Sequence, residues 1–222
     1  MEKTKTCRRG LKRLLAFLLS ALCLLGLLPM SAFAMEPGQT ASSWLGDQYV
    51  GSDGQHYYSP APYTYLVYNS DGTMDVRTSS GGSAYRHYML TVSDGTSHQV
   101  YCVESGIPYN TSDNTYTSES GTNSQYLNLL PAEARRGITL TAIYGWKPGA
   151  SLPVSGINED DYKMATQIIL WEYQQQLRSD PYSRHGNGHA SADQYYSVIA
   201  GRPAEKAYNW ILEQVASHST VP

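Results

Sequence analysis

The chain has 222 residues, with 16 basic and 19 acidic side chains and a formal net charge of −3 at pH 7. This length is enough for one domain with a sizeable hydrophobic core, and the slightly acidic balance makes nucleic acid a poor partner. The sequence holds 19 tyrosines but two phenylalanines. Because tyrosine combines a large apolar ring with a polar tip, this excess suits half-buried strands and binding surfaces.

The first 34 residues have the pattern of a secretory signal peptide. Six basic residues precede an apolar run from Leu14 to Leu28, and Ala32-Phe33-Ala34 has the small-x-small form of a cleavage site. The run is shorter than the roughly 20 residues of a membrane-spanning helix. We therefore predict a cleaved signal at 1–34, with an uncleaved anchor as the alternative, and membrane contact only through this segment. The mature chain would carry ten basic and eighteen acidic residues.

Cys102 is the only cysteine outside the predicted signal, because Cys7 and Cys23 lie within it. A lone cysteine cannot form a disulfide within its own domain, which is the usual role of cysteines in exported proteins. Three explanations remain: an inert buried thiol, an intermolecular disulfide, or a reactive group.

Strand patterns begin after residue 56. Residues 35–56 are rich in Gly, Ser and Gln, and we expect a loosely ordered lead-in there. Residues 63–68 are β-branched and aromatic, 74–77 alternate in polarity, and the turn residues Asn69-Ser70-Asp71-Gly72 lie between them. This pattern predicts a β-hairpin.

A second hairpin is predicted immediately upstream of Cys102. Residues 88–92 lead into Ser93-Asp94-Gly95, and residues 99–103 return. Cys102 is therefore expected near the end of a strand, where a rigid scaffold can present a reactive group to a loop.

The next segments predict a loop and then a helix. Residues 110–125 are rich in Ser, Thr and Asn, which is typical of a loop, and Asn110-Thr111-Ser112 matches a glycosylation sequon. Pro131 occupies a favourable first position for a helix over 132–143.

A second helix is predicted from Asn158, which is a good N-cap followed by three acidic residues, to about Leu177 or Arg178. Its apolar residues surround the helix axis, so it should be buried. Gln167 shares a face of this helix with its neighbours one turn away, Met164, Leu170 and Trp171. A buried glutamine must be hydrogen-bonded or chemically altered. Gln174, Gln175 and Gln176 lie near the end of the predicted helix, where the regular spacing of apolar residues is lost.

Two helical pieces complete the predicted domain. One begins at Ser191 or Asp193 and ends near Gly201, and the other begins at Pro203 and carries an apolar stripe to Val215. The predicted domain limits are 57–216, with 217–222 as a linker or tail leading to other domains of a longer protein.

Two motifs carry a resemblance to a known family. Tyr101-Cys102-Val103-Glu104 followed by Thr166-Gln167-x-x-Leu170-Trp171 resembles the paired motif of the Cys-Gln thioester domains (TQXA type) of Gram-positive surface adhesins. Ile169 departs from the alanine usual in that family, which affects packing beside the amide but not the reacting atoms.

The resemblance implies both a fold and an activity. The fold would be α+β, with a β-rich, hairpin or barrel-like subdomain packed against a helical subdomain and a thioester linking them. Cys102 would supply the thiol and Gln167 the acyl group. The thioester would capture lysine amines of a host surface or matrix protein in a single turnover, on a secreted, cell-surface or cell-wall protein. No cofactor or metal is implied.

The remaining motif residues would shield or support this bond. Water must be kept from a thioester, and Tyr101, Met164 and Trp171 are the side chains expected to exclude it. Support would also come from Glu104, Thr166 and Leu170.

Two other function classes are compatible with the residues. Cys102 could be the nucleophile of a cysteine peptidase or acyltransferase with His185 or His189 as the base. Alternatively, the tyrosines could form a non-covalent binding module for glycans or proteins. A metal site at the two histidines is disfavoured because Gly186 and Gly188 argue against the helix that their spacing would need.

Overall fold

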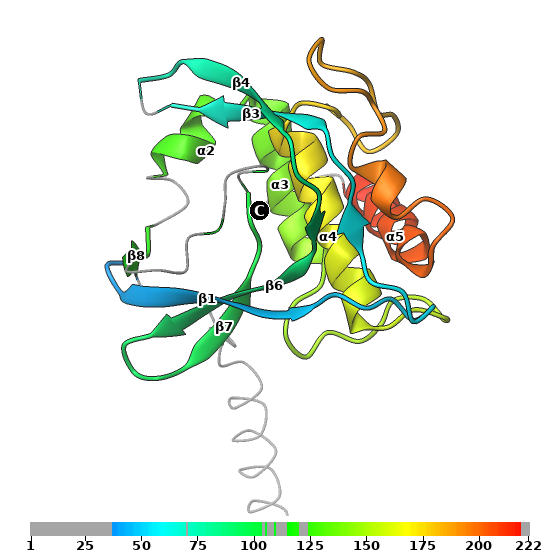
Figure 1. The fold of residues 1–222 in the computed structure, drawn as a ribbon, viewed down its shortest axis with the longest axis horizontal. Helices are drawn as coiled ribbons and strands as arrows, with labels where there is room; N and C mark the ends of the chain where they lie inside the picture. The colour runs from blue at the N-terminus through cyan, green and yellow to red at the C-terminus, as the bar shows by residue number, and fades with distance from the viewer. Residues whose placement is uncertain are drawn as a thin grey trace, which may run out of the picture. The chain divides into compact units, whose positions relative to one another are not determined.

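Strands occupy the first part of the described chain and helices the second (Figure 1). The computed structural model describes residues 37–69, 71–103, 105, 109, 115–119 and 124–218. The predicted signal peptide, the glycosylation sequon, Glu104 and residues 219–222 lie outside this part. The mixture of sheets and helices confirms the α+β class, and the described strands form open sheets rather than a closed barrel.

The main sheet is antiparallel and four-stranded, in the order β7-β6-β1-β8. Its strands are β1 Thr40–Gln48, β6 Arg86–Val92, β7 Ser97–Val100 and β8 Thr115–Thr117. Strands β6 and β7 confirm the second predicted hairpin. Because β7 ends at Val100, Cys102 follows the strand by two residues and lies on the segment that leaves the sheet.

The loosely ordered lead-in predicted for 35–56 is wrong where β1 forms. Its small side chains Ala41 and Ser43 are buried, while alternate positions are exposed. Small residues have weak strand preferences of their own, so the two neighbouring strands β6 and β8 stabilise this one. The outer limits of the predicted domain stay a prediction.

Two smaller antiparallel pairs complete the strand-rich part. Strands β3 Tyr63–Tyr68 and β4 Met74–Ser79 confirm the first predicted hairpin. Strands β2 Tyr58–Ser59 and β5 Ser83–Ala84 form a short second pair. Gly72 has a positive φ of 84°, as its place in the β3–β4 turn requires.

The helices begin close to the predicted positions, but three features differ from the predictions. The described helices are α2 Gln125–Leu129, α3 Ala132–Tyr144, α4 Glu159–Gln174, the 3₁₀ turn Tyr196–Val198 and α5 Pro203–Ser217. Helix α2 was not predicted, and the helix expected from Ser191 or Asp193 is reduced to the 3₁₀ turn. Helix α4 ends at Gln174, earlier than the predicted end at Leu177 or Arg178. No helix within the described residues is long and apolar enough to cross a membrane.

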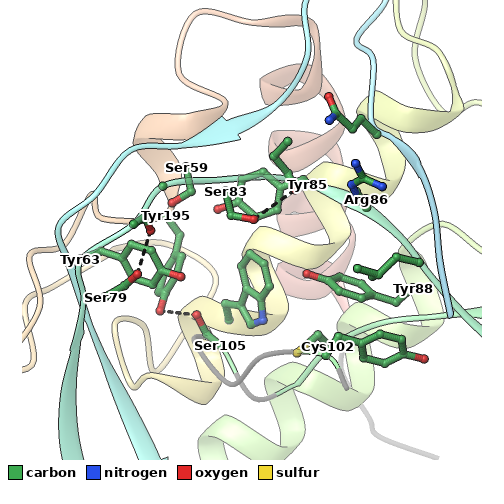
Figure 2. Close-up of a pocket in the computed structure, with 17 residues that line it drawn as sticks. Ser59, Tyr63, Ser79, Ser83, Tyr85, Arg86, Tyr88, Cys102, Ser105 and Tyr195 are labelled. Atoms are coloured by element: carbon green, nitrogen blue, oxygen red, sulfur yellow. Dashed lines mark hydrogen bonds between the residues drawn. The ribbon is translucent and has the colours of Figure 1, made fainter. Parts of the chain in front are cut away.

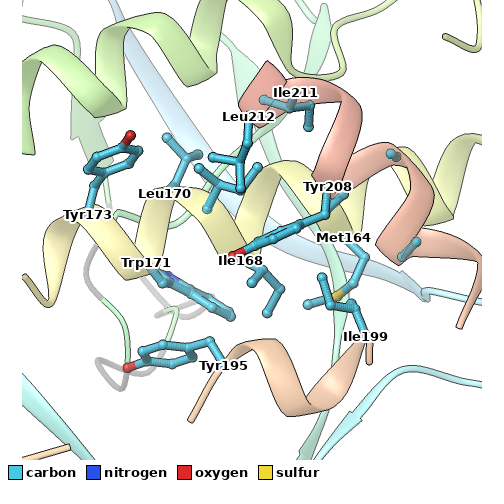
Figure 3. Packing of buried hydrophobic residues seen from close by; sticks show 14 of the residues in the cluster. Met164, Ile168, Leu170, Trp171, Tyr173, Tyr195, Ile199, Tyr208, Ile211 and Leu212 are labelled. Atoms are coloured by element: carbon cyan, nitrogen blue, oxygen red, sulfur yellow. The ribbon is translucent and has the colours of Figure 1, made fainter. Parts of the chain in front are cut away.

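Helix α4 lies at the centre of the hydrophobic core, in contact with both α3 and α5. Asn158 caps it through a capping box with Asp161, which confirms the predicted start. Every residue from Asp161 to Gln174 is buried, as the apolar pattern predicted. Figure 3 shows Met164 and Ile168 of α4 between Tyr208 of α5 and Ile199.

The end of α4 differs from the sequence-based expectation. Gln174 and Gln175, placed where the apolar pattern fades, have no exposed surface. The side chain of Gln175 accepts a hydrogen bond of 2.6 Å from the backbone N–H of Leu66 and donates one of 3.3 Å to its carbonyl. These bonds attach β3 to the end of the buried helix.

Gln175→Leu should therefore destabilise the fold. It removes the acceptor of the buried Leu66 N–H, and an unsatisfied buried group costs about 1–3 kcal/mol. The urea unfolding midpoint should fall by a corresponding amount, whereas the same substitution at exposed Gln125, in the first turn of α2, should leave it nearly unchanged. Equal midpoints for the two variants would contradict this role of Gln175.

Candidate functional site

Cys102 and Gln167, 65 positions apart in the chain, contact each other through two hydrogen bonds. The backbone N–H of Cys102 donates to Gln167 Oε1 at 3.0 Å, and Gln167 Nε2 donates to the carbonyl oxygen of Cys102 at 2.6 Å. The carboxamide is thus paired at both ends with one residue. This arrangement holds the glutamine side chain in a single orientation beside the cysteine.

The chain on either side of Cys102 is held by tyrosine hydroxyls. Tyr101 donates to the backbone carbonyl of Trp146, just after α3, at 3.1 Å. Tyr126 of α2 donates to the carbonyl of Val103 at 2.9 Å. Because both flanking residues are tethered to helical segments, the irregular segment after β7 has a defined course past α4.

Gln167 lies in the buried middle of α4 and has no exposed surface. Its neighbours one turn away are equally enclosed, with Met164 at 0%, Leu170 at 3% and Trp171 at 4% exposure. The structure therefore buries Gln167 together with these three neighbours, and their role as a shield of the carboxamide stays a prediction. Such enclosure strengthens polar contacts, because the local dielectric is lower than that of water.

Thr166 supports the same turn of the helix. Its hydroxyl donates to the carbonyl of Tyr162 at 2.8 Å and accepts from the backbone N–H of Trp146 at 2.9 Å. The side chain is fully buried. It packs closely against Gly145, where an added Cβ would lie 2.4 Å from the Thr166 methyl group. Thr166 thus attaches α4 to the end of α3 one residue before Gln167.

A cavity of about 610 Å³ opens beside Cys102. Figure 2 shows Cys102 and Ser105 on one side of it, with Tyr88 adjacent and Tyr85 and Arg86 further away. Trp171 also lines the cavity and packs between Tyr85 and Tyr195, with ring centroids 5.4 and 5.5 Å apart. The cavity gives a ligand a path to the cysteine.

The tyrosines of the cavity are neutral at physiological pH. Burial raises the pKa of Tyr85, Tyr88, Tyr109 and Tyr195 above the ordinary value of tyrosine. Their hydroxyls therefore act as hydrogen-bonding groups rather than as charges. Serine hydroxyls and tyrosine rings together give the cavity a wall of mixed polar and apolar surface, in which most polar groups are neutral.

The geometry suits acyl chemistry at the Gln167 carbonyl. The Cys102 N–H already donates to the oxygen that would gain negative charge if a nucleophile attacked the carbonyl carbon. Donors placed at that oxygen stabilise the tetrahedral intermediate of acyl transfer. The amide and the thiol also belong to residues held in contact, which reduces the entropy cost of their reaction.

Comparison with known families agrees with this geometry. A family model for the thioester domain matches residues 99–217, more than half of the chain, and the matched range contains both Cys102 and Gln167. The chain belongs to the thioester domain family. No curated protein and no solved structure matches it. Strands β1 to β6 precede residue 99, where the match to the family model begins. In this thioester domain protein, these strands and their connections nevertheless supply most of the residues that line the cavity.

The other candidate residues are separate from this site. His185 and His189 do not line the described wall of the cavity, and their backbone N–H groups bond within the 177–190 loop region. The described residues contain no cluster of His, Cys, Asp and Glu that could hold a metal ion.

Tyr126, Trp146 and the tyrosines of the cavity were not predicted from the sequence as site residues, because their approach to Cys102 depends on long-range packing.

Thr166→Val should lower stability, because it removes the hydroxyl that bonds both Trp146 and Tyr162 in the buried interior. The expected loss is about 1–3 kcal/mol in the free energy of unfolding. Thr139→Val is the matched control, since Thr139 makes the same type of bond to the carbonyl four residues earlier but on the exposed side of α3. Chemical denaturation of both variants measures the difference; a control as unstable as Thr166→Val would contradict it.

Proposed function

We propose that Cys102 and Gln167 condense to an internal thioester and that this bond captures amines. The observation that carries the proposal is the pair of hydrogen bonds between the Gln167 carboxamide and the Cys102 backbone. Membership of the thioester domain family supports it.

The bond forms without a cofactor in this proposal. The Cys102 sulfur attacks the side-chain carbonyl carbon of Gln167, the Cys102 N–H stabilises the oxyanion, and the C–N bond breaks. The thiol proton leaves with the nitrogen, so one ammonia molecule is released. The product stores an acyl group that is more reactive than the original amide.

Capture of a partner is the second step. An amine nitrogen attacks the same carbonyl carbon, the carbon–sulfur bond breaks, and the sulfur regains a proton. The partner then remains attached to the Gln167 side chain through an amide. Because the product stays on the protein, the thioester is consumed in one turnover and the protein acts as a covalent adhesin rather than a turnover enzyme.

The proposed biological setting follows from the family and the leader sequence. The partner is a lysine side chain of a host surface or matrix protein, and the protein is secreted to the surface or cell wall of a Gram-positive bacterium. A signal peptide at 1–34 would export it, and other domains of a longer surface protein would carry it. The net negative charge of the mature chain makes nucleic acid a poor partner.

Intact mass measurement tests the bond directly. The purified protein should be lighter than its sequence by one ammonia, about 17 Da, and methylamine should add about 31 Da to that form. Cys102→Ala and Gln167→Glu should each lack both changes, the second because a carboxylate at neutral pH does not acylate a thiol. Gln125→Ala, at an exposed glutamine, should behave as the wild type.

The same variants separate the alternatives. A wild-type mass equal to that of the unmodified chain, with no methylamine adduct, would refute the thioester. A cysteine hydrolase would retain activity in Gln167→Glu and lose it in His185→Ala or His189→Ala. A non-covalent binding module would keep its partner in Cys102→Ala.

Trp171→Phe should shorten the lifetime of the thioester. The indole fills the space between Tyr85 and Tyr195 in the cavity wall, and a smaller ring would admit water to the acyl group. Hydrolysis restores a mass about 18 Da above the thioester form, and its rate should rise severalfold.

Trp44→Phe is the control for that experiment, since Trp44 is 43% exposed on β1 and does not line the cavity. Time-resolved mass spectrometry of both variants in neutral buffer measures the two rates. Equal hydrolysis rates for Trp171→Phe and the wild type would show that Trp171 does not shield the bond.

A further inference from the structure

Arg86 lines the same cavity as Cys102. It is the first residue of β6, and it lies opposite Gln48 in the register with β1. That register shifts between Leu45 and Gln48, and both of these residues also line the cavity. Arg86 and Tyr88 are two positions apart, so they share one face of the strand and both reach the cavity (Figure 2).

Arg86 is the one charged side chain in the described wall of the cavity. The tyrosines there are neutral, because burial raises the pKa of Tyr63, Tyr85, Tyr88, Tyr109 and Tyr195. No described carboxylate lines the wall. Arg86 therefore supplies the one formal charge of the described wall, and this charge is positive, although the predicted mature chain has more acidic than basic residues.

The guanidinium of Arg86 has no ion pair and no side-chain hydrogen bond within the described part of the chain. The other described arginines all have a partner. Arg77, Arg178, Arg184 and Arg202 form ion pairs, and Arg135 and Arg136 donate to backbone carbonyls. Arg86 is also partly buried, so it has lost part of its hydration without gaining a counter-ion among the described residues.

We infer that Arg86 is a recognition residue for a carboxylate, so that the cavity selects amines whose own molecule carries a carboxylate group. The fork of guanidinium N–H donors matches a carboxylate and forms stronger hydrogen bonds with it than with neutral acceptors. A molecule that bears only ammonium groups would be repelled by the same charge. The inference rests on the proposed thioester and adds the substrate class to it.

The reaction itself is the one proposed above, with a second contact. The amine nitrogen of the ligand forms a bond to the Gln167 carbonyl carbon, the bond to Cys102 sulfur breaks, and one proton passes from nitrogen to sulfur. The carboxylate takes no part in these bond changes. Its pairing with Arg86 holds the amine near the acyl group and so increases the effective concentration of the nucleophile. On a protein partner, a lysine close to an acidic side chain provides this pattern.

A matched pair of probes tests the inference. In the pair 6-aminohexanoate and 6-aminohexanamide, chain length and reacting amine are the same, and only the charge at the far end differs. The corresponding acid and amide pairs with four and five carbons test shorter separations between the amine and the carboxylate. Adduct formation on the purified protein is followed by intact mass, and each rate is corrected for the fraction of unprotonated amine.

For at least one chain length the acid should react about tenfold faster than the amide with the wild-type protein, as expected for a charge-assisted hydrogen bond. In Arg86→Gln this ratio should fall to about one, and in Arg86→Lys, which keeps the charge without the fork, it should be intermediate. Arg77→Gln, at an exposed arginine of β4, should keep the wild-type ratio. A ratio near one at every length in the wild type, or a ratio that survives Arg86→Gln, would overturn the inference.

Methylamine separates failure of this inference from failure of the proposed function. A methylamine adduct without any preference for acids refutes only the role of Arg86. Absence of the methylamine adduct refutes the thioester, and carboxylate recognition is then decided by equilibrium binding. Calorimetry with Cys102→Ala should show hexanoate binding more tightly than hexanamide, and the added Arg86→Gln change should remove the difference; equal affinities in Cys102→Ala would refute the inference.

Discussion

The pairing of the Gln167 carboxamide with the Cys102 backbone is the contact on which the candidate site depends. It joins the segment that leaves the main sheet to the most buried helix of the core. A fully enclosed carboxamide without partners would cost about 1–3 kcal/mol for each unsatisfied group. The cysteine segment therefore stabilises the buried α4 by bonding its carboxamide, and the same two hydrogen bonds place Cys102 beside Gln167.

The same principle extends along α4 and its C-terminal cap, where several buried polar side chains bond to different parts of the fold. Thr166 bonds the chain after α3, and Gln175 bonds β3. Glu172, fully buried, accepts from Arg178 at 2.9 Å and from Tyr208 of α5 at 2.7 Å. Desolvation raises the pKa of Glu172, and the positive charge of Arg178 opposes that shift. These bonded polar groups thus connect the helix to several neighbouring elements, which gives the helix a defined place in the core.

The tyrosines at the site have two structural roles. Tyr101 and Tyr126 tether the residues on either side of Cys102, whereas Tyr85 and Tyr195 enclose Trp171 in the cavity wall. A phenylalanine could replace the ring in the second role but not the hydroxyl in the first. The site therefore combines packed aromatic rings with neutral polar contacts, and Arg86 adds the charge.

Several features could be predicted from the sequence because they depend on local chemistry. Turn residues determine both hairpins, and the cap at Asn158 with the apolar pattern that follows determines α4. Removal of the predicted signal isolates Cys102, and its motif together with that of Gln167 indicates the family. These conclusions need only neighbouring residues or the count of one residue type.

The tertiary structure alone decided the features that depend on distant partners. The segment 40–48 becomes a strand because β6 and β8 pair with it, and Gln175 is buried because β3 offers its backbone to it. Arg86 reaches the cavity of Cys102 because β6 lines the wall, although nothing in its local sequence distinguishes it from an exposed arginine. Short-range patterns determine which elements form, whereas burial and polar pairing across the fold determine which side chains meet.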